Sequence, residues 1–268
     1  MACRSARTNL TAVVANPVQT AAVAETKSAP KNYDFKVGVD TVSQANDLLQ
    51  NNLIHFDWVA KNKSYPNFWG RYLTGENRLT KEEIKFLHSK GCKIVPIYKD
   101  TQIKETEEQG RVHAQKIAEI AMELGIKENT AIFLELPETF KITSDYLRGY
   151  ALGMLSAGYI TGFKVNTDAK YIFGVEFSKA IRSDEKLFNK CLIWSVAPNI
   201  ELHENTDYPH FVRPDYWGPF APAGITRKDI AIWQYTTQCN PINDDIGRET
   251  SFNLNLVTNP KIIIENMF

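Results

Sequence analysis

The chain has 268 residues, of which 43% are hydrophobic and 23% charged, which is an ordinary globular composition. Lysine plus arginine and aspartate plus glutamate both number 31, so the chain lacks the basic excess that nucleic-acid binders usually carry. No apolar run approaches the roughly 20 residues that span a bilayer. The length suits one α/β barrel, which commonly occupies about 250 residues.

The first segment of the chain, residues 1–33, has no hydrophobic periodicity and no aromatic residue before Tyr33. We predict a mobile N-terminal arm or targeting segment here, and one domain over 34–268. The early arginines and the Ala/Val-rich stretch faintly resemble an export signal, but the stretch is short and is interrupted by Asn16 and Pro17. The compartment stays open: extracellular or cell-wall-associated if the chain is exported, and otherwise cytoplasmic.

Strand and helix patterns alternate after this segment. Short, nearly unbroken apolar runs predict strands at 35–40, 67–73, 93–100, 130–136, 160–166, 191–198 and 229–236. Apolar residues at helical spacing predict helices over 41–53, 79–91, 105–126, 143–158 and around 177–181. The 79–91 helix has clear boundaries, since Thr80 and Glu83 match a capping box and Gly91 is a typical C-terminal stop.

This alternation predicts parallel strands joined by crossover helices. Seven or eight such strands in about 235 residues favour a closed (β/α)8 TIM-like barrel, in a single domain, over an open sheet. The glycine-rich turn of a dinucleotide-binding fold is missing after the first strand, where VGVDTVSQ stands instead. A P-loop, a GxSxG elbow, HExxH and CxxC are also absent from the sequence, which argues against several common enzyme classes.

Neither cysteines nor histidines indicate a metal or redox site. The four cysteines, Cys3, Cys92, Cys191 and Cys239, lie far apart in the sequence and are predicted to be free and structural. The five histidines show no ligand spacing. We therefore predict no metal and no cofactor.

The carboxyl ends of the strands build the active site of a (β/α)8 barrel, so the last residues of each predicted strand are the candidates. Three acids lie there and are predicted to be catalytic: Asp40, Glu135 and Glu138. Polar and aromatic residues at the same ends are predicted to bind substrate: Arg71, Tyr98, Asn166, Trp194, Trp233, Gln234 and Tyr235. A barrel end lined by these residues suits a glycan, because sugar rings stack on aromatic faces and their hydroxyls need polar partners.

Glycoside hydrolysis needs one protonated and one ionised carboxyl group. The apolar run around Glu135 is expected to raise its pKa, as a general acid requires. Asp40 or Glu138 would then be the nucleophile, the base or an electrostatic stabiliser.

Each candidate also has a purely structural interpretation. Asp40 is a favoured residue for capping a following helix. Glu138 follows a proline and is typical of a solvated loop. Glu135 could be neutralised by Arg71 inside the barrel mouth, because a buried carboxylate needs a partner. The tryptophans Trp69, Trp194 and Trp233 are equally at home in a core.

Several of these segments together resemble a known family. VGVD in the first strand, FWGRYLTGENRLTKEEIKFLHSKGCKIVPIY (68–98), AIFLELPE in the fourth strand and the closing IAIWQYT are similar to the glycoside-hydrolase-like domain once called domain of unknown function 1906. The similarity extends over about residues 35–258. That family is similar in fold to the family 25 lysozymes, so the resemblance implies a glycan-active barrel related to the cell wall.

The lysozyme acid pattern is only partly present. The resemblance matches Asp40 to the aspartate that ends the first strand. It also implies Asp-x-Glu at the end of the fourth strand, where Glu135 has Phe133 two residues before it and Pro137 two residues after it. Near the C-terminus, where related barrels carry Asp-x-Asn, FNLNL offers Asn253 and Asn255.

Three hypotheses for function remain open. The first is a glycoside hydrolase acting on peptidoglycan or a related amino-sugar polymer, and the second is a barrel that binds such a glycan without hydrolysing it. The third is a structural barrel in a cell-wall or phage-like assembly, with the aromatic-rich segment 207–222 as a surface for a protein partner. The same segment could equally be a long active-site loop, because it precedes the last predicted strand.

Overall fold

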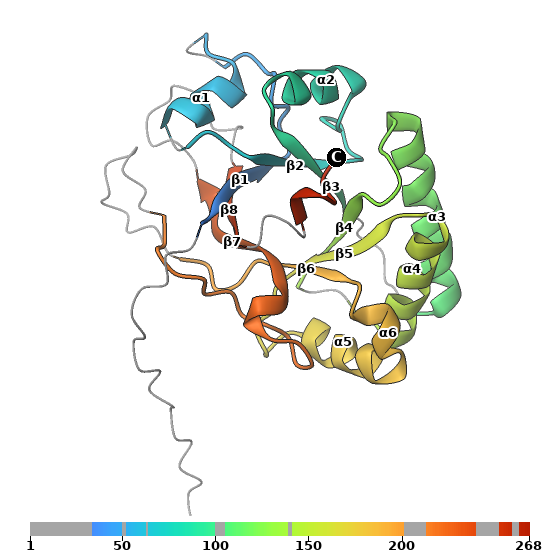
Figure 1. Cartoon of the computed structure of the whole chain (residues 1–268). Helices are drawn as coiled ribbons and strands as arrows, with labels where there is room; N and C mark the ends of the chain where they lie inside the picture. Colours follow the sequence, from blue (N-terminus) through green and yellow to red (C-terminus); the bar gives the residue numbers. More distant parts are fainter. Residues whose placement is uncertain are drawn as a thin grey trace, which may run out of the picture. The chain divides into compact units, whose positions relative to one another are not determined.

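Eight strands close into a barrel in the computed structural model of the chain (Figure 1). The structure describes residues 34–49, 52–62, 64–99, 105–138, 141–200, 213–239, 252–258 and 263–268. The predicted arm or targeting segment, residues 1–33, lies outside the described residues. The barrel belongs to one compact unit, Asn32–Phe268.

The strands follow one another around the barrel in sequence order. They are β1 (Lys36–Thr41), β2 (Phe68–Tyr72), β3 (Lys93–Lys99), β4 (Ala131–Leu136), β5 (Ile160–Val165), β6 (Leu192–Ser195), β7 (Ile230–Cys239) and β8 (Phe252–Val257). The helices lie outside the ring of strands (Figure 1): α1 (His55–Asn62), α2 (Lys81–Ser89), α3 (Glu107–Leu124), α4 (Ser144–Ser156), α5 (Ile172–Ser183) and α6 (Glu185–Phe188), with a 3-10 helix η1 (Arg227–Asp229) before β7. The predicted α/β barrel in a single domain is confirmed.

The last strand departs from the predicted topology. Strands β1 to β7 pair in parallel, but β8 is antiparallel to both of its neighbours, β7 and β1. The expectation of a uniformly parallel barrel is therefore wrong for this strand. An antiparallel strand can follow its neighbour without a crossover helix, so β8 can close the barrel without requiring one more βα unit.

The helix predicted over 41–53 is absent from the described residues 41–49. Side chains form local turns there instead: Ser43 N donates to Thr41 Oγ1 at 3.1 Å, and Gln44 N donates to Asp47 Oδ2 at 2.9 Å. Short polar side chains that bond the nearby backbone compete with helical hydrogen bonds. The helix of this connection forms later in the chain, as α1.

The predicted start of α2 is confirmed at Thr80, whose hydroxyl accepts a hydrogen bond from Glu83 N at 3.1 Å. The second half of the expected capping box is replaced, because the Glu83 carboxylate points to Arg71. Gly91 follows the helix with a φ of 66°, in the left-handed region that glycine adopts at little cost.

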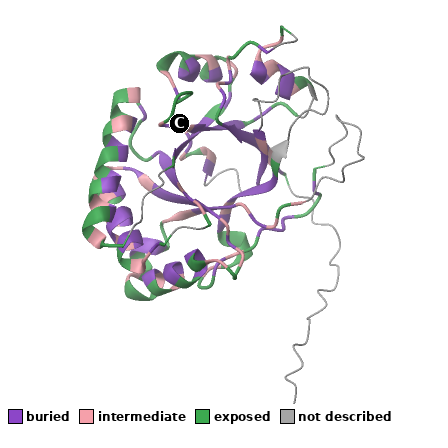
Figure 2. Ribbon diagram, turned by 180° about the vertical axis from the view of Figure 1, so that it is seen from behind, coloured by how far each residue is buried: buried purple, intermediate pink, exposed green. Residues whose placement is uncertain are grey.

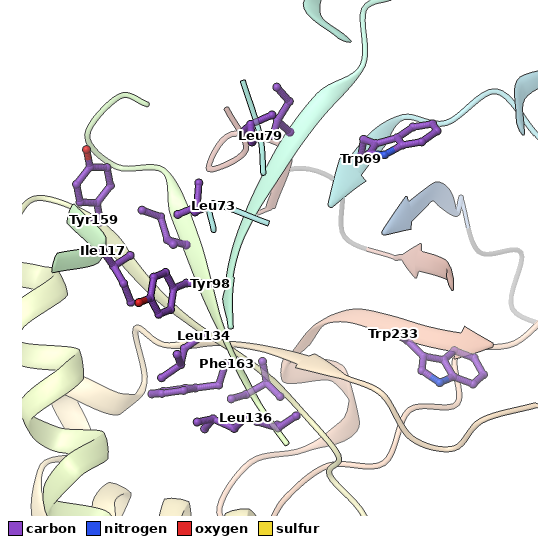
Figure 3. Close-up of a cluster of buried hydrophobic side chains, with 14 of the residues drawn as sticks. Trp69, Leu73, Leu79, Tyr98, Ile117, Leu134, Leu136, Tyr159, Phe163 and Trp233 are labelled. Carbon is purple, nitrogen blue, oxygen red and sulfur yellow. The ribbon is translucent and has the colours of Figure 1, made fainter. Parts of the chain in front are cut away.

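Aromatic rings packed against glycines fill the inside of the barrel. A Cβ added at Gly162 would lie 2.6 Å from the Phe133 ring, and Phe133 packs edge-on against Trp194 with ring centroids 5.4 Å apart. The ring of strands is buried, whereas exposed residues lie on the outer faces of the helices (Figure 2). A second core, between strands and helices, contains residues such as Leu134 and Phe163 (Figure 3).

The amino-terminal end of the barrel is covered by the last residues of the chain. Phe268 exchanges two backbone hydrogen bonds with Ile94 on β3, and Ala131 N on β4 donates to Asn266 O at 2.7 Å. Ile263 and Met267 join the inner core. The strands' carboxyl ends, at the opposite end of the barrel, carry the polar side chains described next.

Replacing Gly162 by alanine should destabilise the protein by about 1–3 kcal/mol, because the added methyl group would overlap the Phe133 ring inside a packed barrel. Gly174→Ala in α5 is the matched control, since its nearest neighbour would be Pro222 Cβ at 3.8 Å. Denaturant unfolding of both variants measures the difference. Equal stability of the two variants would show that the interior tolerates the extra volume.

Candidate functional site

A cleft of about 360 Å³ lies at the carboxyl ends of the strands. Its floor and walls include two of the three predicted acids, Asp40 and Glu135, and two lysines, Lys99 and Lys164. The other polar residues of the lining are Thr41, Tyr72, Thr237 and Asn253, together with the predicted residues Glu138, Asn166 and Gln234. The predicted location of the site at this end of the barrel therefore coincides with a real cleft.

Strand register brings one glutamate between two lysines. Lys99 on β3 is paired with Glu135 on β4, and Glu135 is paired with Lys164 on β5. Lys99 Nζ lies 2.8 Å from Glu135 Oε1, and Lys164 Nζ lies 3.1 Å from Oε2. Each carboxylate oxygen of Glu135 therefore faces an ammonium group.

Lys164 also binds Asp40, on the floor of the cleft. Its Nζ lies 2.5 Å from Asp40 Oδ2, which Asn253 Nδ2 contacts at 2.9 Å. Asn255 Nδ2 donates to the other oxygen at 2.7 Å, and the Asp40 side chain has no exposed surface. Asp40 is thus a buried carboxylate with three side-chain donors, and the alternative that it caps a helix is wrong.

Tyr72 on β2 completes this network. Its hydroxyl donates to Glu135 Oε2 at 2.6 Å, and Lys164 Nζ lies 3.4 Å from the same hydroxyl oxygen. Burial raises the pKa of Tyr72, an effect that the charge of Lys164 opposes. The phenol therefore remains a neutral donor to Glu135 at neutral pH.

The charge state of Glu135 differs from the sequence-based expectation. Burial raises its pKa, but the charge of Lys164 and the hydrogen bonds from Lys99 and Tyr72 outweigh burial and lower the pKa to about 2. Burial also lowers the pKa of Lys164, but the nearby anions, Asp40 foremost, raise it well above its ordinary value. The expected raised pKa of Glu135 is wrong, and both groups are charged at neutral pH.

The two acids are close enough to act as a pair. Asp40 Oδ2 and Glu135 Oε2 both contact Lys164 Nζ, so they are separated by at most the sum of those two contacts, 5.6 Å. The carboxyl groups of retaining glycosidases lie about 5–5.5 Å apart. This upper bound is compatible with such a pair, and Lys164 contacts both of its members.

Arg71 lies in the wall behind the cleft and has no exposed surface. Its guanidinium binds Glu83 Oε1 at 2.7 Å and donates to three backbone carbonyls, those of Thr41, Val42 and Asn77. It thereby ties the loops after β1 and β2 to α2. Because the Arg71 side chain is fully buried, the prediction that Arg71 contacts substrate is not supported. The alternative that Arg71 neutralises Glu135 is wrong, since its guanidinium binds Glu83.

Most of the predicted aromatic platform is buried. Tyr98, Trp194, Trp233 and Tyr235 are each at most 4% exposed. Tyr98 faces outward into the core beneath the helices (Figure 3), and Trp233 packs against Tyr216 and Trp217. Trp194 faces inward and donates from its indole to Asn255 Oδ1 at 2.9 Å. The expected direct contact of these four residues with a ligand is therefore not supported. The alternative that the tryptophans belong to the core is supported.

Glu138, Asn166 and Gln234 lie where a ligand can reach them. Glu138 is exposed and accepts a hydrogen bond from Asn166 Nδ2. Gln234 is 4% exposed and faces the cleft from β7. Their roles in binding or catalysis stay predictions.

Sequence reasoning missed Tyr72, Lys99 and Lys164. Lys99 and Lys164 occupy inward-facing positions on their strands, as the acids that they bind also do. A lysine inside the apolar run ITGFKV was the available signal, because a buried ammonium group requires an anion.

The remaining predictions concern the cysteines, a metal site, a membrane span and the partner surface. Cys92 and Cys191 are free, as predicted, while Cys3 and the side chain of Cys239 lie outside the described residues. Within the described ranges, no group of three or more His, Cys, Asp or Glu side chains is placed to hold a metal ion, and no helix is long and apolar enough to cross a membrane. Of the predicted partner surface 207–222, residues 213–222 are described, with Tyr216 and Phe220 exposed.

Known proteins provide a family match and a fold match. The family model for the Rv2525c-like, glycoside hydrolase-like domain matches residues 60–247, more than half of the chain. An uncharacterized protein from B. stearothermophilus is 23% identical with a TM-score of 0.70, over 87% of this chain and 100% of that chain. No curated protein matches the chain.

Two lysozyme-like structures are more distant. The modular autolysin LytC from Streptococcus pneumoniae, in complex with a synthetic peptidoglycan ligand, is 13% identical with a TM-score of 0.46, over 83% of this chain and 46% of that chain. A family GH25 lysozyme from Aspergillus fumigatus is 9% identical with a TM-score of 0.45, over 86% and 97%.

Replacing Arg71 by leucine should destabilise the protein by about 3–5 kcal/mol, because Glu83 and three carbonyls would lose their buried partner. Arg148→Leu is the control, since Arg148 pairs with Glu107 on the surface and its loss should cost at most about 1 kcal/mol. Urea unfolding compares the two. A loss at Arg71 no larger than that at Arg148 would contradict the structural role.

Proposed function

Because the chain belongs to the Rv2525c-like, glycoside hydrolase-like domain family, we propose that its cleft binds a glycan of the peptidoglycan or related amino-sugar class without hydrolysing it. The observation that carries this proposal is the position of Lys164, whose ammonium group contacts both acids of the cleft. A glycosidase needs one of its two carboxyl groups protonated. Lys164 favours the ionised form of Glu135.

The polar lining supports glycan binding. Glu135 offers carboxylate oxygens, Lys99 an ammonium group that is 49% exposed, and Asn166 and Asn253 side-chain amides. These groups can accept from and donate to sugar hydroxyls around one ring. With the tryptophans buried, Tyr72 is the aromatic residue of the described lining, so recognition relies on hydrogen bonds more than on stacking.

Glu135 is not suited to donate a proton. The pKa of Glu135, about 2, leaves almost no protonated form at neutral pH, whereas an effective general acid has a pKa near the working pH. Asp40 is buried and accepts hydrogen bonds from Lys164, Asn253 and Asn255.

Hydrolysis is the second candidate, and the spacing of Asp40 and Glu135 favours it. A separation of at most 5.6 Å fits two carboxyl groups that act on one glycosidic bond. A bound glycan that drew Lys99 away from Glu135 would remove one of the contacts that lower the Glu135 pKa. Hydrolysis would release new reducing ends, whereas binding alone would release none, so the two candidate functions can be distinguished by measurement.

Purified peptidoglycan and chitin oligomers test the proposal in one set of measurements. We expect the wild-type protein to bind at least one of them and to release no new reducing ends. Glu135→Gln should keep the glycan affinity within about threefold, because the amide oxygen still accepts and the other lining groups are unchanged. Glu108→Gln, on the exposed surface of α3, is the matched control.

Two outcomes would overturn it. Reducing ends released by the wild type and by Glu108→Gln, but not by Glu135→Gln, would establish hydrolysis with Glu135 in a catalytic role. Binding to neither glycan would remove the proposed function altogether.

A further inference from the structure

We propose that the wall of the cleft formed by β7 and the segment after β6 is a subsite for an acetamido group. This inference rests on the proposed glycan binding and specifies which part of an amino sugar the chain recognises. The residues of the subsite are Val196, Gln234 and Thr237, all of which line the cleft.

A β-bulge in β7 turns two of these residues toward the cleft. Gln234 is paired with Asn255 on β8, but Thr236 is paired with Leu254, so two steps along β7 match one step along β8. Such a bulge changes which side chains face inward beyond it. Gln234 before the bulge and Thr237 after it therefore both line the cleft, although three positions separate them.

Gln234 offers an acceptor that lacks a partner within the described part of the chain. Its side chain is 4% exposed, and its Oε1 is buried without a hydrogen bond. Buried polar atoms are nearly always hydrogen-bonded, so an unpartnered one in a cleft wall indicates a ligand that donates to it. An amide N–H is such a donor.

Thr237 offers a donor on the same wall of the cleft. Its Oγ1 accepts a hydrogen bond from Asn199 Nδ2 at 2.8 Å, so its own hydrogen can be directed to a ligand. Thr237 and Asn199 are both exposed, which leaves the hydroxyl accessible from the cleft. A ligand carbonyl oxygen is the matching acceptor.

Val196 supplies the apolar part of the same wall. It is half-buried and directly follows β6. An acetamido group consists of an N–H, a carbonyl and a methyl group, which match in turn the carbonyl of Gln234, the hydroxyl of Thr237 and the methyl groups of Val196. A plain sugar hydroxyl could use only one of the two polar contacts.

The opposite wall differs in character. Lys99, Glu135 and Lys164 form a row of charges there, across β3, β4 and β5. The neutral wall is therefore the part of the cleft that suits an uncharged amide, while the charged wall suits hydroxyl groups.

Affinities for two tetrasaccharides test the subsite. Chitotetraose carries an acetamido group on each ring where cellotetraose carries a hydroxyl, so the ratio of their affinities isolates that group. Isothermal titration should show that the wild-type protein binds chitotetraose about tenfold more tightly, as two hydrogen bonds to a ligand would give. Gln234→Met and Thr237→Val should each reduce this ratio by about threefold or more. Gln115→Met on the exposed face of α3 is the control and should leave the ratio unchanged.

The outcomes separate this inference from the proposed function. Equal affinity of the wild type for both tetrasaccharides, or an unchanged ratio in both variants, would overturn the subsite while glycan binding stands. Binding of neither tetrasaccharide, together with no binding to peptidoglycan, would overturn both. Thr237 is exposed, so Thr237→Val is expected to fold and keeps the test decisive if Gln234→Met is unstable.

Discussion

Lys164 holds one ammonium group against two carboxylates, 2.5 Å from Asp40 and 3.1 Å from Glu135. Moving such a charge out of water is unfavourable by several kcal/mol unless it is paired, so the ammonium group of Lys164 depends on these two partners. The same contacts set the chemistry of the cleft. They help to keep Glu135 ionised, whereas the general acid of a glycoside hydrolase must be protonated.

The barrel itself makes this contact possible. Register brings Glu135 between Lys99 and Lys164, and the antiparallel β8 brings Asn253 and Asn255 to Asp40. Gly70 lies opposite Asp40 on β2, where an added Cβ would approach Asp40 Cβ to 2.6 Å and the Trp194 ring to 2.8 Å. A side chain at that position would therefore displace the carboxylate from Lys164.

Much of this architecture could be predicted from the sequence, because alternating strand and helix patterns directly reflect a barrel. The family resemblance is confirmed by the match over residues 60–247. Strand ends alone, however, do not tell which residues face inward. The strand ends predict Arg71 and Tyr98 in the cleft, but the side chains of both residues face the outside of the barrel. The side chain of Lys164 faces the inside, and Lys164 is not among the predicted residues. The pKa of Glu135 could not be predicted at all, because its cause is a lysine on the neighbouring strand.

The titration of the Glu135 carboxyl group, followed by carbon NMR, tests the account most directly. We expect a midpoint near pH 2 in the wild type. Lys164→Met should raise the midpoint, because the largest of the contacts that oppose the effect of burial would be lost. A wild-type midpoint at or above 4.5 would contradict the account, because Glu135 would then be available as a general acid.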